Sequence, residues 1–124
     1  MLIKGIETNA HPDIGQWYNL FIYWIKHPSV LTLSFEEFVI SHSSCLATTK
    51  KIAQFVTEDQ LSPDQLNQWA LKMIENLHPQ TSSTFRKGKI GGWRDEFTDE
   101  MKEAFKAAAG NLLISLGYEE NFNW

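Results

Sequence analysis

The feature that most constrains this chain is a single strand-like segment in a sequence whose other periodic segments are helical. Residues 29–35 read Ser-Val-Leu-Thr-Leu-Ser-Phe, and Leu31, Leu33 and Phe35 alternate with polar residues as in a half-buried strand. A strand by itself leaves its backbone donors and acceptors unpaired, so its partner must come from elsewhere. The segment therefore predicts that this chain adds one strand to a sheet whose other strands precede it.

Amphipathic helices are expected on both sides of that segment. Their starts carry capping signals: Asp13 after a His-Pro pair, Ser62 followed by Pro and by Gln at the capping-box position, and Thr98 followed by two acidic residues. Gly117 is the expected stop of the last helix. Between the third and fourth helices the periodicity disappears, which predicts a loop at 78–97. The helices are expected at 13–26, 43–56, 62–77 and 98–116.

Length and charge limit the organisation and the partners of the chain. It has 124 residues, of which 43% are hydrophobic, and it has no repeat or linker, so 1–124 is treated as a single unit. A formal net charge of -4 argues against a nucleic-acid partner bound through bulk positive charge. The longest apolar stretch, about 20–25, is much shorter than the roughly 20 residues of a membrane span. We expect no leader, no nucleic acid and no membrane.

Isolated polar residues do not form a recognisable catalytic or metal site. Cys45 is the only cysteine, which excludes an intrachain disulfide and a cysteine-based zinc site and fits a cytoplasmic protein. Glu36 and Glu37 are adjacent, so they diverge in direction, and a solvated turn is the better interpretation than an acid–base pair. We therefore expect no catalytic residue and no metal. The histidines, which lack metal-ligand spacing, are His11, His27, His42 and His78.

The most informative run lies in the expected loop, at 84–98. Four of the 11 basic residues fall between Arg86 and Arg94, and three glycines are interspersed with them. A guanidinium can clamp phosphate oxygens, an ammonium adds charge, and glycine lets backbone N–H groups approach a ligand. This pattern is compatible with a phosphate site, although on composition such a loop is more often a solvated connection.

This run also resembles a family signature. Residues 86–98 read Arg-Lys-Gly-x-x-Gly-x-Trp-Arg-x-x-Phe-Thr and are similar to the C-terminal Arg-Lys-Gly-x-x-Gly-Asp-Trp-Lys-x-x-Phe-Thr of the cytosolic-type sulfotransferases. Three further stretches resemble the family in the same order: Gly-Gln-Trp-Tyr at 15–18, Val-Leu-Thr-Leu-Ser-Phe-Glu-Glu-Phe at 30–38 and Lys-Ile-Ala-Gln-Phe-Val at 51–56.

The resemblance implies both a fold and a function. It implies an α/β fold, the C-terminal half of a P-loop-like sulfotransferase domain, mostly helical here with one clear strand. It implies that Arg86, Lys87 and Gly88 hold the 3'-phosphate of 3'-phosphoadenosine 5'-phosphosulfate (PAPS), the donor of a sulfuryl group to a small-molecule hydroxyl acceptor. The family's phosphosulfate loop and catalytic histidine have no counterpart in this sequence, so we expect a truncated domain or one half of a split enzyme.

The sequence departs from the family at four places. Phe35 stands where the family has a tyrosine before the glutamate. Gly92 replaces the aspartate before the tryptophan, and Asp99 replaces a valine of the family's dimer-forming stretch. The positions that would contact adenine fall near 72–74, which contain no aromatic ring.

Two interpretations from other classes remain open: a non-catalytic helical interaction module, and a stand-alone phosphate-binding fragment. If the rest of the sheet lies on another chain, the strand and the aromatic face of the first helix would bind a complementary N-terminal chain or a second copy.

Overall fold

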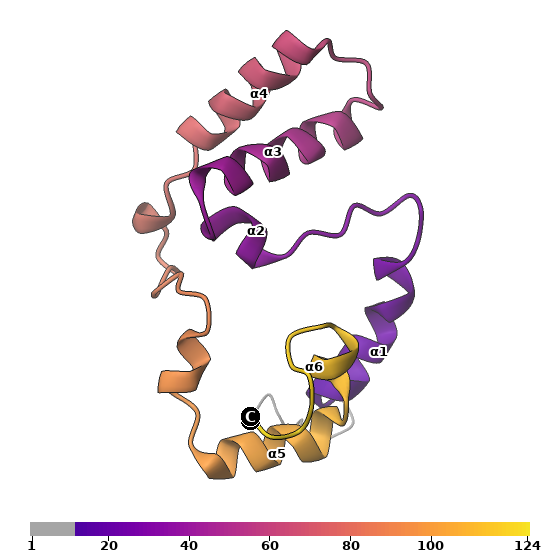
Figure 1. Ribbon diagram of the computed structural model, residues 1–124, viewed down its shortest axis with the longest axis vertical. Coiled ribbons are helices and arrows are strands. Elements are labelled where there is room, and N and C mark those ends of the chain that lie inside the picture. The colour runs from indigo at the N-terminus through magenta and orange to yellow at the C-terminus, as the bar shows by residue number, and fades with distance from the viewer. Residues whose placement is uncertain (1–11) are drawn as a thin grey trace. The chain divides into compact units, whose positions relative to one another are not determined.

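The structure is a computed structural model that describes residues 12–124, which form helices and short irregular connections (Figure 1). The helices expected at 13–26, 43–56 and 62–77 are confirmed to within a few residues. The elements are α1 (Ile14–Ile25), α2 (Phe35–Val39), α3 (His42–Val56), α4 (Pro63–Glu75), the 3-10 turns η1 (Pro79–Thr81) and η2 (Gly92–Asp95), α5 (Asp99–Ala109) and α6 (Leu112–Ser115).

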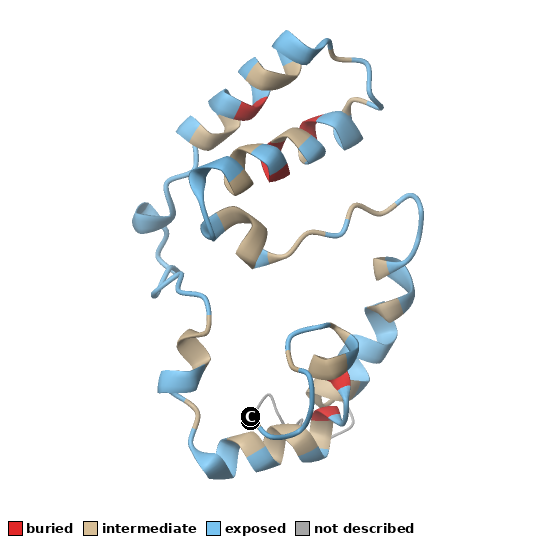
Figure 2. Ribbon diagram, in the orientation of Figure 1, coloured by how far each residue is buried: buried red, intermediate tan, exposed pale blue. Residues whose placement is uncertain are grey.

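The described residues divide into two compact units, each with its own small core (Figure 2). One unit, called here the terminal unit, consists of 12–30 and Trp93–Trp124 and contains α1, α5 and α6. The other, called the central unit, is Leu31–Gly92 and contains α2, α3 and α4.

The expected α/β fold is wrong for the described part of the chain, where the structure is all-helical and contains no strand (Figure 1). The alternation is real at the start of the segment, where Leu31 and Leu33 are half-buried and Thr32 is exposed, but it ends there, since Ser34 is half-buried and Phe35 is 48% exposed. However, no second strand is available among residues 12–124 to pair with this backbone. The end of the segment instead starts a helix, since Ser34 is the N-cap of α2 and Phe35 is its first residue.

The central unit is built by α3, which packs against both α2 and α4. Each of these two helices buries a small residue, Ala53 in α3 and Ala70 in α4. Two threonines of α3 are also buried, and their hydroxyls have partners: Thr48 Oγ1 donates to the Glu37 carbonyl at 3.3 Å and Thr49 Oγ1 to the Cys45 carbonyl at 2.6 Å. These bonds remove the cost of burying the hydroxyl groups.

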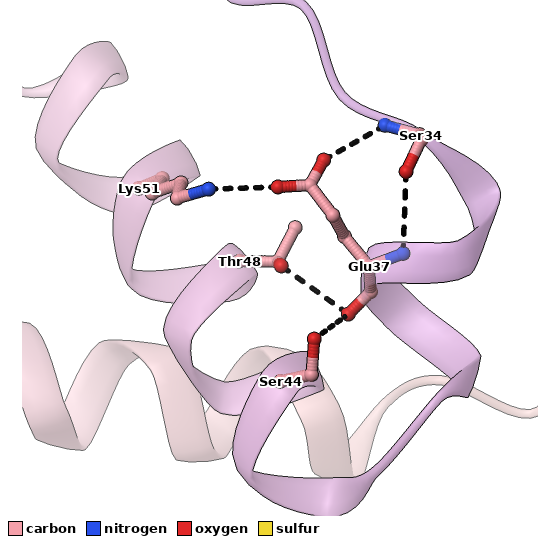
Figure 3. A network of polar contacts seen from close by, with 5 residues as sticks. All are labelled: Ser34, Glu37, Ser44, Thr48 and Lys51. Atoms are coloured by element: carbon pink, nitrogen blue, oxygen red, sulfur yellow. Dashed lines mark hydrogen bonds and ion pairs between the residues drawn. The ribbon is translucent and has the colours of Figure 1, made fainter. Parts of the chain in front are cut away.

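Glu37 joins α2 to α3 through both its side chain and its backbone (Figure 3). Its carboxylate accepts from the Ser34 N–H at 2.8 Å, which closes a capping box with Ser34, and from Lys51 Nζ at 2.7 Å. Its carbonyl accepts from Ser44 Oγ at 2.8 Å and from Thr48 Oγ1 at 3.3 Å. The hydrogen bond from Lys51, followed by the one from Ser34, lowers the pKa of the Glu37 carboxyl.

Replacement of Glu37 should therefore have a pH-dependent effect on stability. Because the folded-state pKa of Glu37 is lowered, its ionised form stabilises the fold above the unfolded pKa, and this is lost as pH falls through the folded pKa. We expect urea unfolding to show Glu37→Gln less stable than the natural chain at pH 7, with the difference narrowing below about pH 4. Glu75→Gln, at the exposed end of α4, is the control and should show no such trend. If Glu37→Gln differed from the natural chain by the same unfolding free energy at all pH values, the stabilising role of ionised Glu37 would be contradicted.

The terminal unit depends on close contact between α1 and α5. Asp13 caps α1, as expected, in a capping box with Gln16. Gly15 in the first turn lies against α5, where a Cβ atom would come within 2.5 Å of the Ala108 carbonyl oxygen. Ala109 and Leu112 complete the buried core.

The last helix is shorter than expected. Thr98 caps α5 as predicted, but the helix expected over 98–116 ends at Ala109, and α6 starts only at Leu112. The break falls at Gly110, whose φ of 58° and ψ of -128° lie outside the helical region.

Substitution of Gly15 should loosen the terminal unit. A methyl group at this position has to displace backbone rather than a flexible side chain, so we expect Gly15→Ala to destabilise the fold by about 1–3 kcal/mol. Thermal unfolding followed by tryptophan fluorescence measures the change. The matched control is Gly92→Ala, because the nearest atom to a Cβ there is 3.8 Å away. Equal effects of the two substitutions would be inconsistent with the α1–α5 contact.

Candidate functional site

The basic run predicted to bind phosphate forms an exposed turn between η1 and η2. We call residues 84–91 the basic turn. Arg86, Lys87 and Gly88 lie side by side in it, and all three are exposed, as is Lys89. The structure thus places the three predicted site residues on one accessible stretch of the central unit.

Glycine is required in the basic turn by its backbone conformation. Gly88 has φ +55° and Gly91 has φ +70°, values that L side chains rarely adopt. At Gly88 the space is also taken, because an added Cβ would lie 2.9 Å from Cε2 of the Phe85 ring. The positive φ and the covering ring together fix how the chain turns immediately after Lys87.

Local hydrogen bonds hold both ends of the basic turn. The Phe85 N–H donates to the Ser82 carbonyl at 3.2 Å, and the hydroxyls of Ser82 and Thr84 are 3.0 Å apart. At the other end the Gly92 N–H donates to the Lys89 carbonyl at 3.3 Å. The basic side chains therefore extend from a backbone with a defined path rather than from an unconstrained linker.

The chemistry of the basic turn suits an anion. A guanidinium offers paired donors that match phosphate oxygens, and a neighbouring ammonium adds a point charge. Positive-φ glycines can direct successive backbone N–H groups toward the same anion. A metal ion has no evident site in the described region, because residues 12–124 contain no cluster of three or more potential ligands.

Arg94 belongs to a different environment from the other three basic residues. It lies in the terminal unit, where its Nη2 is 2.7 Å from Oε1 of Glu119 and its Cζ is 4.6 Å from the centre of the Trp93 ring. The Arg94 guanidinium thus makes both an ion pair with Glu119 and a cation–π contact with Trp93. Arg94 therefore has a carboxylate partner within its own unit, although its side chain is 57% exposed.

The central unit also has an open groove between its helices, with a volume of about 580 Å³. Of the three positions expected near adenine, Lys72 and Met73 line this groove and Ile74 does not. Sequence analysis found no aromatic ring there, but α2 contributes Phe38 to the same groove. No local signal could have revealed this, because Phe38 and Met73 are distant in sequence. The full lining is Phe38, Thr49, Ile52, Lys72, Met73, Asn76 and Leu77.

The remaining polar residues have local structural roles. Glu36 and Glu37 belong to helix α2, not to the solvated turn expected for them, and the signal that sequence analysis missed is the Ser-x-x-Glu capping box. His27 Nδ1 accepts from the Ser29 N–H at 3.2 Å. Cys45 is half-buried in α3. His11 lies outside the described residues.

Comparisons with known proteins add no relative. Neither protein-family models, nor curated proteins, nor solved structures match this chain. Among residues 12–124, no helix has both the length and the apolar character needed to cross a bilayer.

Proposed function

We propose that this chain binds the 3'-phosphate of a 3'-phosphoadenosine nucleotide through the basic turn, as part of a sulfotransferase-like activity. Arg86 and Lys87 hold the phosphate through charge-assisted hydrogen bonds, and Gly88 presents its backbone. The nucleotide is PAPS, which supplies the sulfuryl group, and the acceptor is the hydroxyl of a small molecule. The single cysteine in the sequence fits a reducing compartment such as the cytoplasm.

The observation that carries this proposal is the conformation of the basic turn. Its two cations stand immediately before a glycine with φ +55°, and their exposure leaves them accessible to a ligand. Left-handed glycines also form ordinary turns. What distinguishes this one is that two adjacent cations precede it, so charged side chains and backbone N–H groups lie in one short exposed stretch. The local conformation and the sulfotransferase-like signature therefore support the same ligand, a phosphate dianion.

The groove of the central unit supports a role in binding the nucleoside. It lies in the same unit as the basic turn, and its lining combines the Phe38 ring with the apolar side chains of Ile52 and Met73. Adenine binds well against such surfaces because a planar base gains both stacking and apolar contact. Asn76, also in the lining, adds an amide group at the end of α4.

Removing the guanidinium of Arg86 should weaken binding of adenosine 3',5'-bisphosphate. A hydrogen bond to a charged group contributes about 1.5–3 kcal/mol, so we expect Arg86→Ala to raise the Kd by about 10- to 100-fold in isothermal titration calorimetry. Arg94→Ala is the matched control, because the Arg94 guanidinium is paired with Glu119 and should not contribute to binding.

The nucleotide itself provides the second control. Adenosine 5'-phosphate lacks the 3'-phosphate, so it should bind the natural chain more weakly and respond little to Arg86→Ala. Equal binding of the two nucleotides, or equal losses from Arg86→Ala and Arg94→Ala, would contradict the proposal.

A second candidate function is an interaction module, which the surface of α1 favours. None of the 12 residues of this helix is fully buried. Tyr23 is 82% exposed, Leu20 63% and Trp24 60%. Exposed aromatic and aliphatic side chains in this number on one short helix are characteristic of contact surfaces. With no strand in the described residues, α1 replaces the predicted sheet edge as the surface for a complementary chain or a second copy.

Self-association through α1 can be measured directly. We expect sedimentation velocity to show a concentration-dependent dimer, and Trp24→Ala to raise its dissociation constant by about tenfold or more, because a buried tryptophan is a typical interface anchor. Phe55→Ala removes a similarly exposed ring from α3 and is the control. A monomer at all concentrations, or equal effects of both substitutions, would exclude the dimer. Nucleotide affinity should be the same for both variants.

A further inference from the structure

The terminal unit contains an apolar cavity that neither the basic turn nor α1 explains. Its volume is about 160 Å³. Its walls come from η2, the segment before α5, α5, α6 and the C-terminal residue, so it lies wholly within one unit. The lining residues are Trp93, Phe97, Phe105, Leu113 and Trp124.

The four rings of the cavity are held against one another by edge-to-face contacts. Trp124 lies 5.4 Å from Trp93 and 5.9 Å from Phe105 between ring centres, with interplanar angles of 88° and 75°. Phe97 is 5.6 Å from Trp93 at 71°. These are the distances and angles that aromatic pairs prefer. The rings therefore form a fixed frame in which a further ring can make the same kind of contact.

Two cations lie close to this frame. Arg94 Cζ is 4.6 Å from the centre of the Trp93 ring, and Lys106 Nζ is 5.0 Å from the centre of the Trp124 ring. The electron-rich faces of the Trp93 and Trp124 rings are thus already occupied by cationic side chains of the protein. Each of these cations is also paired with a carboxylate, Arg94 with Glu119 and Lys106 with Glu103. A charged ligand would therefore lose its hydration without gaining a counter-ion, whereas a neutral ring would not.

We propose that this cavity is a binding site for a small, neutral, monocyclic aromatic molecule. Its lining is almost wholly apolar, so water inside it finds few hydrogen-bond partners on the protein and is readily displaced by an apolar ligand. The cavity is partly open to solvent, and its volume of about 160 Å³ is of the size that holds one six-membered ring. The site lies outside the basic turn, so it can bind whether or not the nucleotide proposal holds.

The test uses benzyl alcohol and benzylammonium, two probes of nearly equal size that differ in charge. The chain has five tryptophans, whose indole N–H resonances report on separate places. With the natural chain, benzyl alcohol should shift the resonances of Trp93 and Trp124 saturably. It should leave Trp17, which stacks on Phe21 in α1, unshifted. Benzylammonium should bind about tenfold or more weakly, because the apolar lining offers its ammonium group no counter-ion.

Blocking the cavity provides the matched variant. Leu113→Trp places a larger side chain in the cavity wall and should weaken benzyl alcohol binding by about tenfold or more. Leu116→Trp makes the same change at a neighbouring position outside the lining, and it should leave benzyl alcohol binding unchanged. Nuclear Overhauser contacts between the probe and the Trp124 ring in the natural chain do not depend on either variant folding. Absence of those contacts, equal binding of both probes, or unchanged binding by Leu113→Trp would overturn the proposal.

Discussion

The capping box between Ser34 and Glu37 decides the fold of the central unit. Ser34 still has extended backbone, and the two capping-box hydrogen bonds satisfy free N–H groups at the point where the helical residues of α2 begin. Once α2 forms, Glu37 can reach Lys51 with its carboxylate, while its carbonyl receives the hydroxyls of Ser44 and Thr48. Because those partners lie on α3, the cap determines how α2 packs against α3.

Sequence predicted the parts of this fold that depend on neighbouring residues. The caps at Asp13, Ser62 and Thr98 are confirmed, because a side chain that reaches the backbone three residues ahead needs no tertiary partner. The strand prediction is wrong because a strand, unlike a cap, depends on a partner that is distant in sequence. Alternation reports which side chains are covered, but a strand exists only where a second backbone pairs with it. The end of α5 at Gly110 is also a local feature, but the helix-favouring alanines before Gly110 led to the prediction of one longer helix.

The candidate sites divide in the same way. The order of Arg86, Lys87 and Gly88, and the need for glycine at the third position, could be read from the sequence. The covering of Gly88 by a ring three residues earlier is almost as local. The place of Phe38 in the groove and that of Trp124 in the cavity could not be predicted, because each ring meets residues far away in the chain.

Counting basic residues along the chain would give Arg86 and Arg94 the same role, yet their surroundings differ. Arg94 rests on a ring face and is neutralised by Glu119, so its charge adds little to any field beyond its own unit. Arg86 is exposed beside a glycine turn whose backbone can contribute further donors. Gly88 and Gly91, with φ of +55° and +70°, lie in the same short stretch as Arg86 and Lys87, so backbone donors and cations occur together there. The proposed anion site is therefore defined by the glycine turn, and it is shorter than the basic run in which it lies.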